Sequence, residues 1–238
     1  MEKSHINKNE LKLRLQKLGS LWHNPQGECV VYVMSRDQRV NDNHALIAAQ
    51  KHALAHNLPL AVVFNFNVTK TTRSYEQYEF MISGLYEVER TLHNLHIPLI
   101  GLVGEHVARL EALCHHLKPA AVYVDFSPLN GPRAVQELLA KKHPVIVVDT
   151  HNIVPVWIAS LKQEVGARTL RPKINHHLPM FCIEPELLIK HPIDWPNKAV
   201  IGLDEVVDIF GDRLSKVKES GVSHEYVPGE TAANEFLQ

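Results

Sequence analysis

The sequence predicts an α/β fold, a doubly wound, Rossmann-like parallel sheet of five strands with helices on both faces. Five short apolar runs lie between residues 29 and 148, and they lack the alternation of polar and apolar residues that half-exposed strands show. Uninterrupted apolar strands are typical of a parallel sheet that helices cover on both faces. Helical segments separate the runs, and this alternation with short turns is typical of doubly wound folds.

The five predicted strands alternate with four predicted helices. The strands cover residues 29–34, 60–65, 98–103, 120–125 and 145–148. Right-handed crossovers fix the hand of such a sheet, and we predict the strand order 3-2-1-4-5, as in doubly wound folds with one reversal of strand order.

Two of the four helices have clear start signals. Asp42 or Asn43 caps the first helix, and Ser74 with Gln77 has the form of a capping box at the start of the longest. The four helices are expected over residues 43–56, 74–96, 105–117 and 132–142.

Two less regular parts flank residues 28–174, which form the predicted α/β domain. In the N-terminal extension, residues 1–27, apolar residues at helical spacing predict a short amphipathic helix over residues 10–22. Residues 175–238 are expected to form an irregular wrap and the start of a linker, with one short helix over residues 203–210. Long helices are not expected there because prolines recur, at Pro172, Pro179, Pro185, Pro192 and Pro196.

Composition excludes several classes of protein. The 238 residues carry a formal net charge of −1, whereas a self-sufficient DNA-binding domain is more often basic. The three cysteines form no CxxC pair, which suits buried thiols in a reducing compartment. The N-terminus has no signal-peptide pattern, and no apolar run approaches the ~20 residues of a membrane-spanning helix. We therefore expect a cytoplasmic protein without a membrane partner.

No catalytic residue and no metal site is predicted. The nucleotide-binding patterns GxGxxG and GxxxxGK[ST] and the nucleophile pattern GxSxG are absent from the sequence. Among 16 histidines, His52 and His56 lie four residues apart on one helix face and form a feasible metal pair, but no third ligand is obvious. The histidines are expected to be mostly exposed and partly protonated near neutral pH.

A ligand site is predicted at the carboxyl ends of the first and fourth strands, where the strand order reverses. The loops there offer hydrogen-bonding groups and apolar side chains, which suit a planar heterocycle better than a polyphosphate. The predicted site residues are Met34, Ser35, Arg36, Phe64, Phe66, Asp125, Phe126 and Ser127. In the alternative interpretation the charged residues of the first loop pair with one another and only hold the turn; these are Arg36, Asp37, Arg39 and Asp42.

A second polar cluster follows the fifth strand, in the stretch 149–174. It consists of Trp157, Lys162, Gln163, Glu164, Arg168, Arg171 and Lys173. Its cations either meet phosphate, from DNA or from a flavin, or pair with Glu164 and neighbouring acids and join the domain to a partner. We favour the partner interpretation, in which Trp157 is an interface or core anchor.

Four blocks of the sequence resemble the N-terminal domain of class II cyclobutane pyrimidine dimer photolyases and follow in the same order. They are residues 30–46, 78–89, 124–129 and 149–174. The tail 227–237 is similar to the segment that leads into that family's second, helical domain, which holds FAD and the lesion pocket. We expect the chain to lack that domain. One departure is His44, where the family usually has Trp.

This resemblance implies an antenna and docking module of a light-driven DNA repair enzyme, a deoxyribodipyrimidine photo-lyase, without catalytic activity of its own. The switch-point site would hold an antenna pigment, in the family an 8-hydroxy-5-deazaflavin, a folate or a flavin. The second cluster would face a helical FAD domain, through which alone the chain would reach DNA. Without that domain, Trp157 and Phe236 are expected to face solvent, a second copy or a separate partner, which favours self-association or a disordered tail. Alternatively, residues 185–196 fold back and cover this apolar patch. The alternative is a free-standing α/β module that binds a flavin, a nucleotide or another protein and has lost the light reaction.

Overall fold

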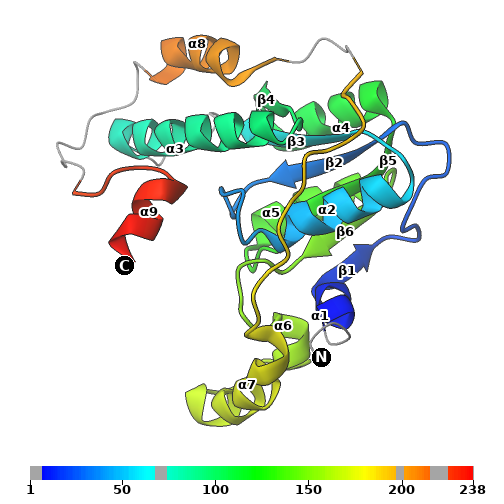
Figure 1. The fold of residues 1–238 in the computed structure, drawn as a ribbon, viewed down its shortest axis with the longest axis vertical. Coiled ribbons are helices and arrows are strands. Elements are labelled where there is room, and N and C mark those ends of the chain that lie inside the picture. Colours follow the sequence, from blue (N-terminus) through cyan, green and yellow to red (C-terminus); the bar gives the residue numbers. More distant parts are fainter. Residues whose placement is uncertain (1–6, 68–73, 197–200, 215–224, 238) are drawn as a thin grey trace.

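One six-stranded sheet forms the centre of the protein, with helices on both faces (Figure 1). The computed structural model describes residues 7–67, 74–196, 201–214 and 225–237. The strands are β1 Leu15–Leu18, β2 Cys29–Met34, β3 Leu60–Phe66, β4 Leu99–Val103, β5 Pro119–Asp125 and β6 Val145–Val148. Their order is β1-β6-β5-β2-β3-β4. The five predicted strands are therefore present, mutually parallel and in the predicted order, and β1 is an addition to the prediction.

The prediction of one helix over residues 10–22 is wrong, because the chain turns within this segment. Helix α1 (Asn7–Leu13) ends, and β1 then pairs antiparallel with β6. The buried guanidinium of Arg14 fixes the turn, since it pairs with Glu10 and donates to three backbone carbonyl oxygens of the 149–153 segment. β1 also pairs with the outer backbone groups of β6, which would otherwise form an open sheet edge.

Helices fill the connections between the parallel strands, as predicted. They are α2 His44–Ala55, α3 Tyr75–Asn94, α4 His106–Leu117 and α5 Asn130–Leu139. Both start signals are confirmed. The side-chain oxygen of Asn43 accepts a hydrogen bond from the backbone N–H of Leu46 at 3.0 Å, and Ser74 and Gln77 form the capping box that begins α3.

Two hydrophobic clusters lie on the two faces of the sheet. The even-numbered residues of β2 pack in a cluster with α2, α3 and α8 (Leu203–Leu214). The odd-numbered residues of β2 pack in the other cluster, with α4 and α5. All six residues of β2 are therefore buried, which explains why its sequence shows no polar alternation.

The expectation of no long helix around residue 174 is wrong. Helix α7 (Ala167–Phe181) follows the single turn α6 (Val156–Ala159) and contains two prolines, Pro172 and Pro179. It runs across the predicted boundary between residues 174 and 175. An apolar stripe packs against the preceding segment and stabilises α7; its residues are Leu170, Ile174, Leu178 and Phe181. Each proline removes one backbone donor, and the packing of this stripe offsets that loss.

The irregular wrap is confirmed for residues 182–196, which cross α2. The side-chain amide of Gln50 exchanges two hydrogen bonds with the backbone of Ile189, at 2.7 and 3.0 Å. Helix α8 begins at the predicted residue and extends to Leu214. The last helix is α9 (Glu230–Phe236). Within the described ranges, no helix combines the length and the apolar character needed to cross a membrane.

Candidate functional site

Asp125, the last residue of β5, holds the turn that follows β2. One of its buried carboxylate oxygens accepts the backbone N–H groups of Ser35 and Arg36, both at 2.8 Å, and of Asp37 at 3.2 Å. The other oxygen accepts the hydroxyl hydrogen of Tyr32 at 2.6 Å. Burial, and next the charge of Asp125, raise the pKa of Tyr32 well above its usual value, so the hydroxyl stays a donor. Asp125 therefore shapes the switch point and has no free oxygen for a ligand.

Ion pairs and amide contacts close the rest of this turn. Arg39 pairs with Asp37 at 2.9 Å and donates to the carbonyl oxygen of Asp42 at 2.7 Å. Asn43 donates to the carbonyl oxygens of Asp37 and Arg39, at 3.1 and 2.9 Å. The interpretation that the charged residues hold the turn is therefore confirmed for three of them. It is wrong for Arg36, whose exposed guanidinium has no hydrogen-bond or ion-pair partner among the described residues.

Asp37 and His151 add polar groups at the same edge of the sheet. Oδ2 of Asp37 is buried and finds no hydrogen-bond donor within the described part of the chain. Burial, and next the charge of Asp125, raise the pKa of Asp37, whereas Arg39 lowers it. Nδ1 of His151 lies 3.6 Å from the other oxygen of Asp37, and its ring is half exposed. His151 was not among the predicted site residues. It lies just beyond the carboxyl end of β6, and this position is the sequence feature that could have indicated it.

Most of the predicted apolar site residues lie in the core. Met34, Phe64 and Phe66 are buried, and Phe66 packs against Phe210 of α8 with ring centroids 5.6 Å apart. Phe126 is half buried, 5.7 Å from the ring of Trp157. The buried Ser127 accepts the N–H of Leu129 at 3.2 Å. The structure thus brings Ser35, Arg36 and Asp125 together and places the two β3 phenylalanines away from that surface.

A small hollow lies elsewhere on the described surface. It is lined by Glu10, Leu11, His44, Ile47, Pro185 and Glu186. His44 occupies one wall, and burial followed by the charges of two arginines lowers its pKa to about 3. The imidazole is therefore neutral near pH 7, and the hollow is too small for a planar ring system.

The second predicted cluster divides into paired and unpaired residues. Glu164 accepts from Lys173 at 2.5 Å and from Ser160 at 2.7 Å, and these contacts, followed by one with Thr169, lower the pKa of Glu164 to about 2. The exposed side chains of Lys162, Gln163, Arg168 and Arg171 take part in none of these contacts. Trp157 is half buried and donates its indole N–H to the carbonyl oxygen of Leu13 at 2.8 Å, so part of the ring packs on this domain, and its role as an interface anchor stays a prediction.

The C-terminal tail is bound to the domain next to the switch point. The carboxylate of Glu230 accepts the backbone N–H groups of Val40 and Asn41, both at 3.0 Å. Thr231 donates its backbone N–H to Glu87 of α3 at 2.9 Å. Phe236 is 75% exposed, as expected. The tail therefore joins the loop after β2 to α3 and presents an apolar end to solvent.

Comparison with known proteins places residues 30–192 in the DNA photolyase family. The deoxyribodipyrimidine photo-lyase of Potorous tridactylus is 42% identical over 171 residues, which are 70% of this chain and 32% of that protein. The deoxyribodipyrimidine photo-lyase of Arabidopsis thaliana is 34% identical over 236 residues, 95% of this chain and 47% of that protein. The chain thus spans about a third to a half of the length of these relatives.

Two solved structures share the fold. A bacterial class III photolyase from Agrobacterium tumefaciens has a TM-score of 0.58 at 18% identity, over 92% of this chain and 45% of that one. A cryptochrome of Synechocystis has a TM-score of 0.61 at 12% identity, over 74% of this chain and 39% of that one. At these identities the likeness concerns the fold alone.

Proposed function

This chain belongs to the DNA photolyase family, and we propose that it is the antenna-pigment-binding and docking domain of a class II repair enzyme for cyclobutane pyrimidine dimers. A pigment bound here absorbs near-ultraviolet or blue light, and its energy passes to FAD held by a helical domain. The residues of this chain bind, orient and dock, and the repair chemistry belongs to the FAD domain.

Docking is supported by exposed apolar side chains between α6 and α7. Leu161 is 94% exposed and Val165 is fully exposed, although neither is needed to cover the domain's own core. The exposed cations Lys162, Arg168 and Arg171 flank them. Apolar side chains with a charged rim are typical of protein interfaces, where arginine is enriched. This surface is the single observation that carries the proposed docking.

The occupant of this surface is the helical FAD-binding domain. The relatives are about two to three times as long as the part that this chain matches, so a large further domain accompanies this fold in them. The resemblance relates both this surface and the tail to the junction between domains.

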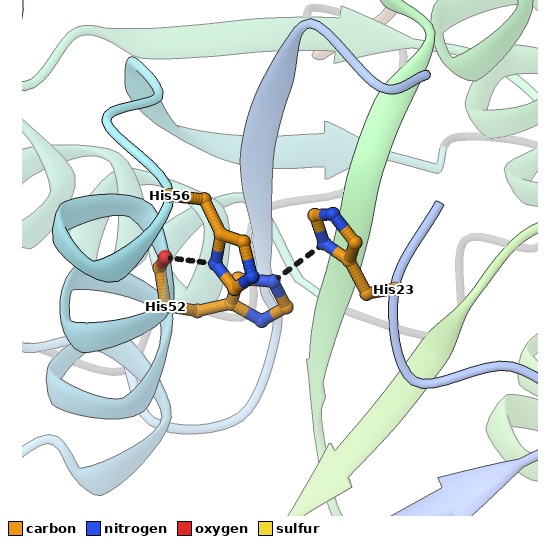
Figure 2. Close-up of side chains that lie close together, drawn as sticks. All are labelled: His23, His52 and His56. Atoms are coloured by element: carbon orange, nitrogen blue, oxygen red, sulfur yellow. Dashed lines mark hydrogen bonds between the residues drawn. The ribbon is translucent and has the colours of Figure 1, made fainter. Parts of the chain in front are cut away.

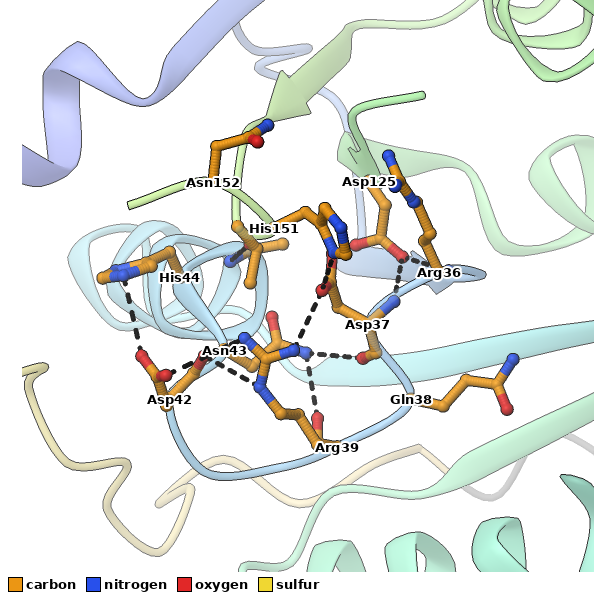
Figure 3. Close-up of polar contacts among 12 residues, drawn as sticks. Arg36, Asp37, Gln38, Arg39, Asp42, Asn43, His44, Asp125, His151 and Asn152 are labelled. Atoms are coloured by element: carbon orange, nitrogen blue, oxygen red, sulfur yellow. Dashed lines mark hydrogen bonds and ion pairs between the residues drawn. The ribbon is translucent and has the colours of Figure 1, made fainter. Parts of the chain in front are cut away.

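Pigment binding is supported by two unpaired groups at the switch point. The guanidinium of Arg36 and the buried Oδ2 of Asp37 lie on adjacent residues of one turn (Figure 3). Of the two, the exposed guanidinium is the group that can donate to the polar edge of a deazaflavin, folate or flavin ring. Since Phe64 and Phe66 are in the core, the apolar contact comes from the half-buried Phe126.

The docking proposal is tested by mixing this chain with the separately produced C-terminal half of the Arabidopsis thaliana relative. We expect a one-to-one complex in calorimetry and size-exclusion chromatography. The double variant Leu161→Asp, Val165→Asp should weaken it at least ~10-fold, because two carboxylates would be buried against an apolar surface.

Leu187→Asp is the matched control, since Leu187 is 83% exposed but lies on the wrap beyond α7. Its affinity should equal that of the unchanged chain. Absence of a complex, or the same loss in the control, would contradict the proposed docking and favour a free-standing module.

A further inference from the structure

Three histidines from two distant segments lie together at the C-terminal end of α2 (Figure 2). His52 is in the last turn of α2 and His56 is its C-cap residue, whereas His23 comes from the connector between β1 and β2. One ring nitrogen from each lies within 4.8 Å of the other two. The ring centroids of His23 and His56 are 4.2 Å apart, and those of His52 and His56 are 4.6 Å apart. His23 supplies the third ring nitrogen, which the sequence does not reveal.

In His52 and His56, Nδ1 forms a hydrogen bond outside the cluster, which leaves Nε2 of each ring for the cluster. Nδ1 of His56 lies 2.9 Å from the carbonyl oxygen of His52, so it carries the proton and leaves the Nε2 lone pair free. Nδ1 of His52 lies 2.9 Å from the hydroxyl of Tyr123, which can accept its proton in the same way. Metal-binding histidines usually donate their second ring N–H to such an oxygen, which fixes the tautomer and the ring orientation.

The spacing of one pair of nitrogens is close to that of a metal site, and the nitrogen of His56 lies within 4.8 Å of both. Nδ1 of His23 is 2.9 Å from Nε2 of His52. Two nitrogen ligands of a tetrahedral Zn²⁺ ion, each about 2.0–2.1 Å from the metal, are about 3.3 Å apart. The two rings therefore need to separate by only a few tenths of an ångström to admit an ion between them.

The surroundings of His23 and His52 favour the neutral form of these two rings. Burial, and next the neighbouring histidines, lower the pKa of His52 to about 4 and also lower the pKa of His23. Neutral imidazole is the form that binds metal. No carboxylate belongs to the cluster within the described ranges, and a donor set of imidazoles alone suits Zn²⁺ rather than Mg²⁺ or Ca²⁺.

We propose that His23, His52 and His56 bind one Zn²⁺ ion, with water as the fourth ligand. The exposed His56 leaves the ion open to solvent, and such an open fourth position is a feature of three-ligand zinc sites. The ion joins the connector between β1 and β2 to the end of α2. Because it binds the folded arrangement, it stabilises this part of the domain.

The test is a calorimetric titration of the full chain, freed of any histidine tag and of metal, with Zn²⁺. We expect one ion per chain and a rise in melting temperature. His23→Gln and His56→Gln should each lower the affinity at least about 100-fold, since removal of an outer hydrogen-bond partner alone costs about 10–100-fold. Neither side chain belongs to the buried core, so both variants should fold.

Two further variants make the result specific. His93→Gln, at an exposed histidine of α3, should keep the affinity and the thermal shift of the unchanged chain. Tyr123→Phe keeps all three ligands and should weaken binding about 10–100-fold. Weak binding to several ions that depends only on the number of histidines, or one tight site that survives His23→Gln or His56→Gln, would overturn the proposal. Unchanged affinity in Tyr123→Phe would overturn the tautomer assigned to His52.

Discussion

Replacement of Asp125 by Asn should destabilise the fold more than any conservative surface change. One oxygen of Asp125 accepts three backbone N–H groups of the 35–37 turn, and the other accepts the Tyr32 hydroxyl. An amide has only one oxygen, so it cannot serve both sides as an acceptor. It must turn its NH₂ group either toward the backbone N–H groups or toward Tyr32.

The magnitude follows from the better of these two orientations. A hydrogen bond to a charged group contributes about 1.5–3 kcal/mol and a neutral one about 0.5–1.5 kcal/mol. When a neutral amide replaces the carboxylate as acceptor, the three hydrogen bonds from backbone N–H groups together lose about 3–4 kcal/mol. An amide costs less to bury than a carboxylate, which offsets part of this loss. We expect the free energy of unfolding to fall by about 2–4 kcal/mol, out of the 5–15 kcal/mol that is usual for domains.

Urea denaturation at pH 7, followed by circular dichroism, measures this loss. Asp194→Asn is the matched control, because Asp194 is exposed and should change the free energy of unfolding by less than about 0.5 kcal/mol. If Asp125→Asn were as stable as the control, Asp125 would not be the centre of the switch-point turn.

Three further predictions concern the turn, the tail and pH. Arg36→Ala should leave the free energy of unfolding within about 0.5 kcal/mol and should weaken pigment binding, measured by absorbance titration, by about 1–3 kcal/mol. Glu230→Gln replaces a charged acceptor of the N–H groups at 40–41, and limited proteolysis should then cleave residues 225–237 faster than in the unchanged chain. The pKa of His44 is lowered from 6.5 to about 3, so the unfolded chain binds more protons as pH falls. Stability should be full above pH 6.5 and fall toward pH 3, and His44→Gln should flatten that fall in urea midpoints. Cleavage at equal rates, or equal pH profiles, would contradict the last two predictions.

The sheet could be predicted from the sequence because its signals are local. Each parallel strand is buried on both faces and reads as an apolar run, and Asn43 and Ser74 cap their helices with neighbouring residues. The residues before β2 were ambiguous, since leucines at 11, 15 and 18 fit a helix as well as a short helix followed by a strand. Whether the helix continues or a strand begins depends on Arg14, which contacts a segment more than 130 residues away. Propensity also fails for α7, where packing of an apolar stripe outweighs two prolines.

The candidate sites were predictable only where the ends of neighbouring strands form them. The turn after β2 and Asp125 meet because parallel strands end at one edge of the sheet. By contrast, the direction of Phe64 and Phe66 depends on α8, which covers them from more than 130 residues away. The approach of His23 to His52 depends on the path of an irregular connector, for which the sequence has no periodic signal.

The central claim is that this chain docks and binds pigment while an FAD domain performs the repair. A photorepair assay tests this claim most directly. DNA that contains thymine dimers is illuminated with blue light in the presence of the chain, FAD and a reductant, with and without the C-terminal half of a relative. The account predicts no loss of dimers with the chain alone and light-dependent loss once the FAD-binding half is added. Light-dependent loss of dimers that the chain catalyses alone would contradict it.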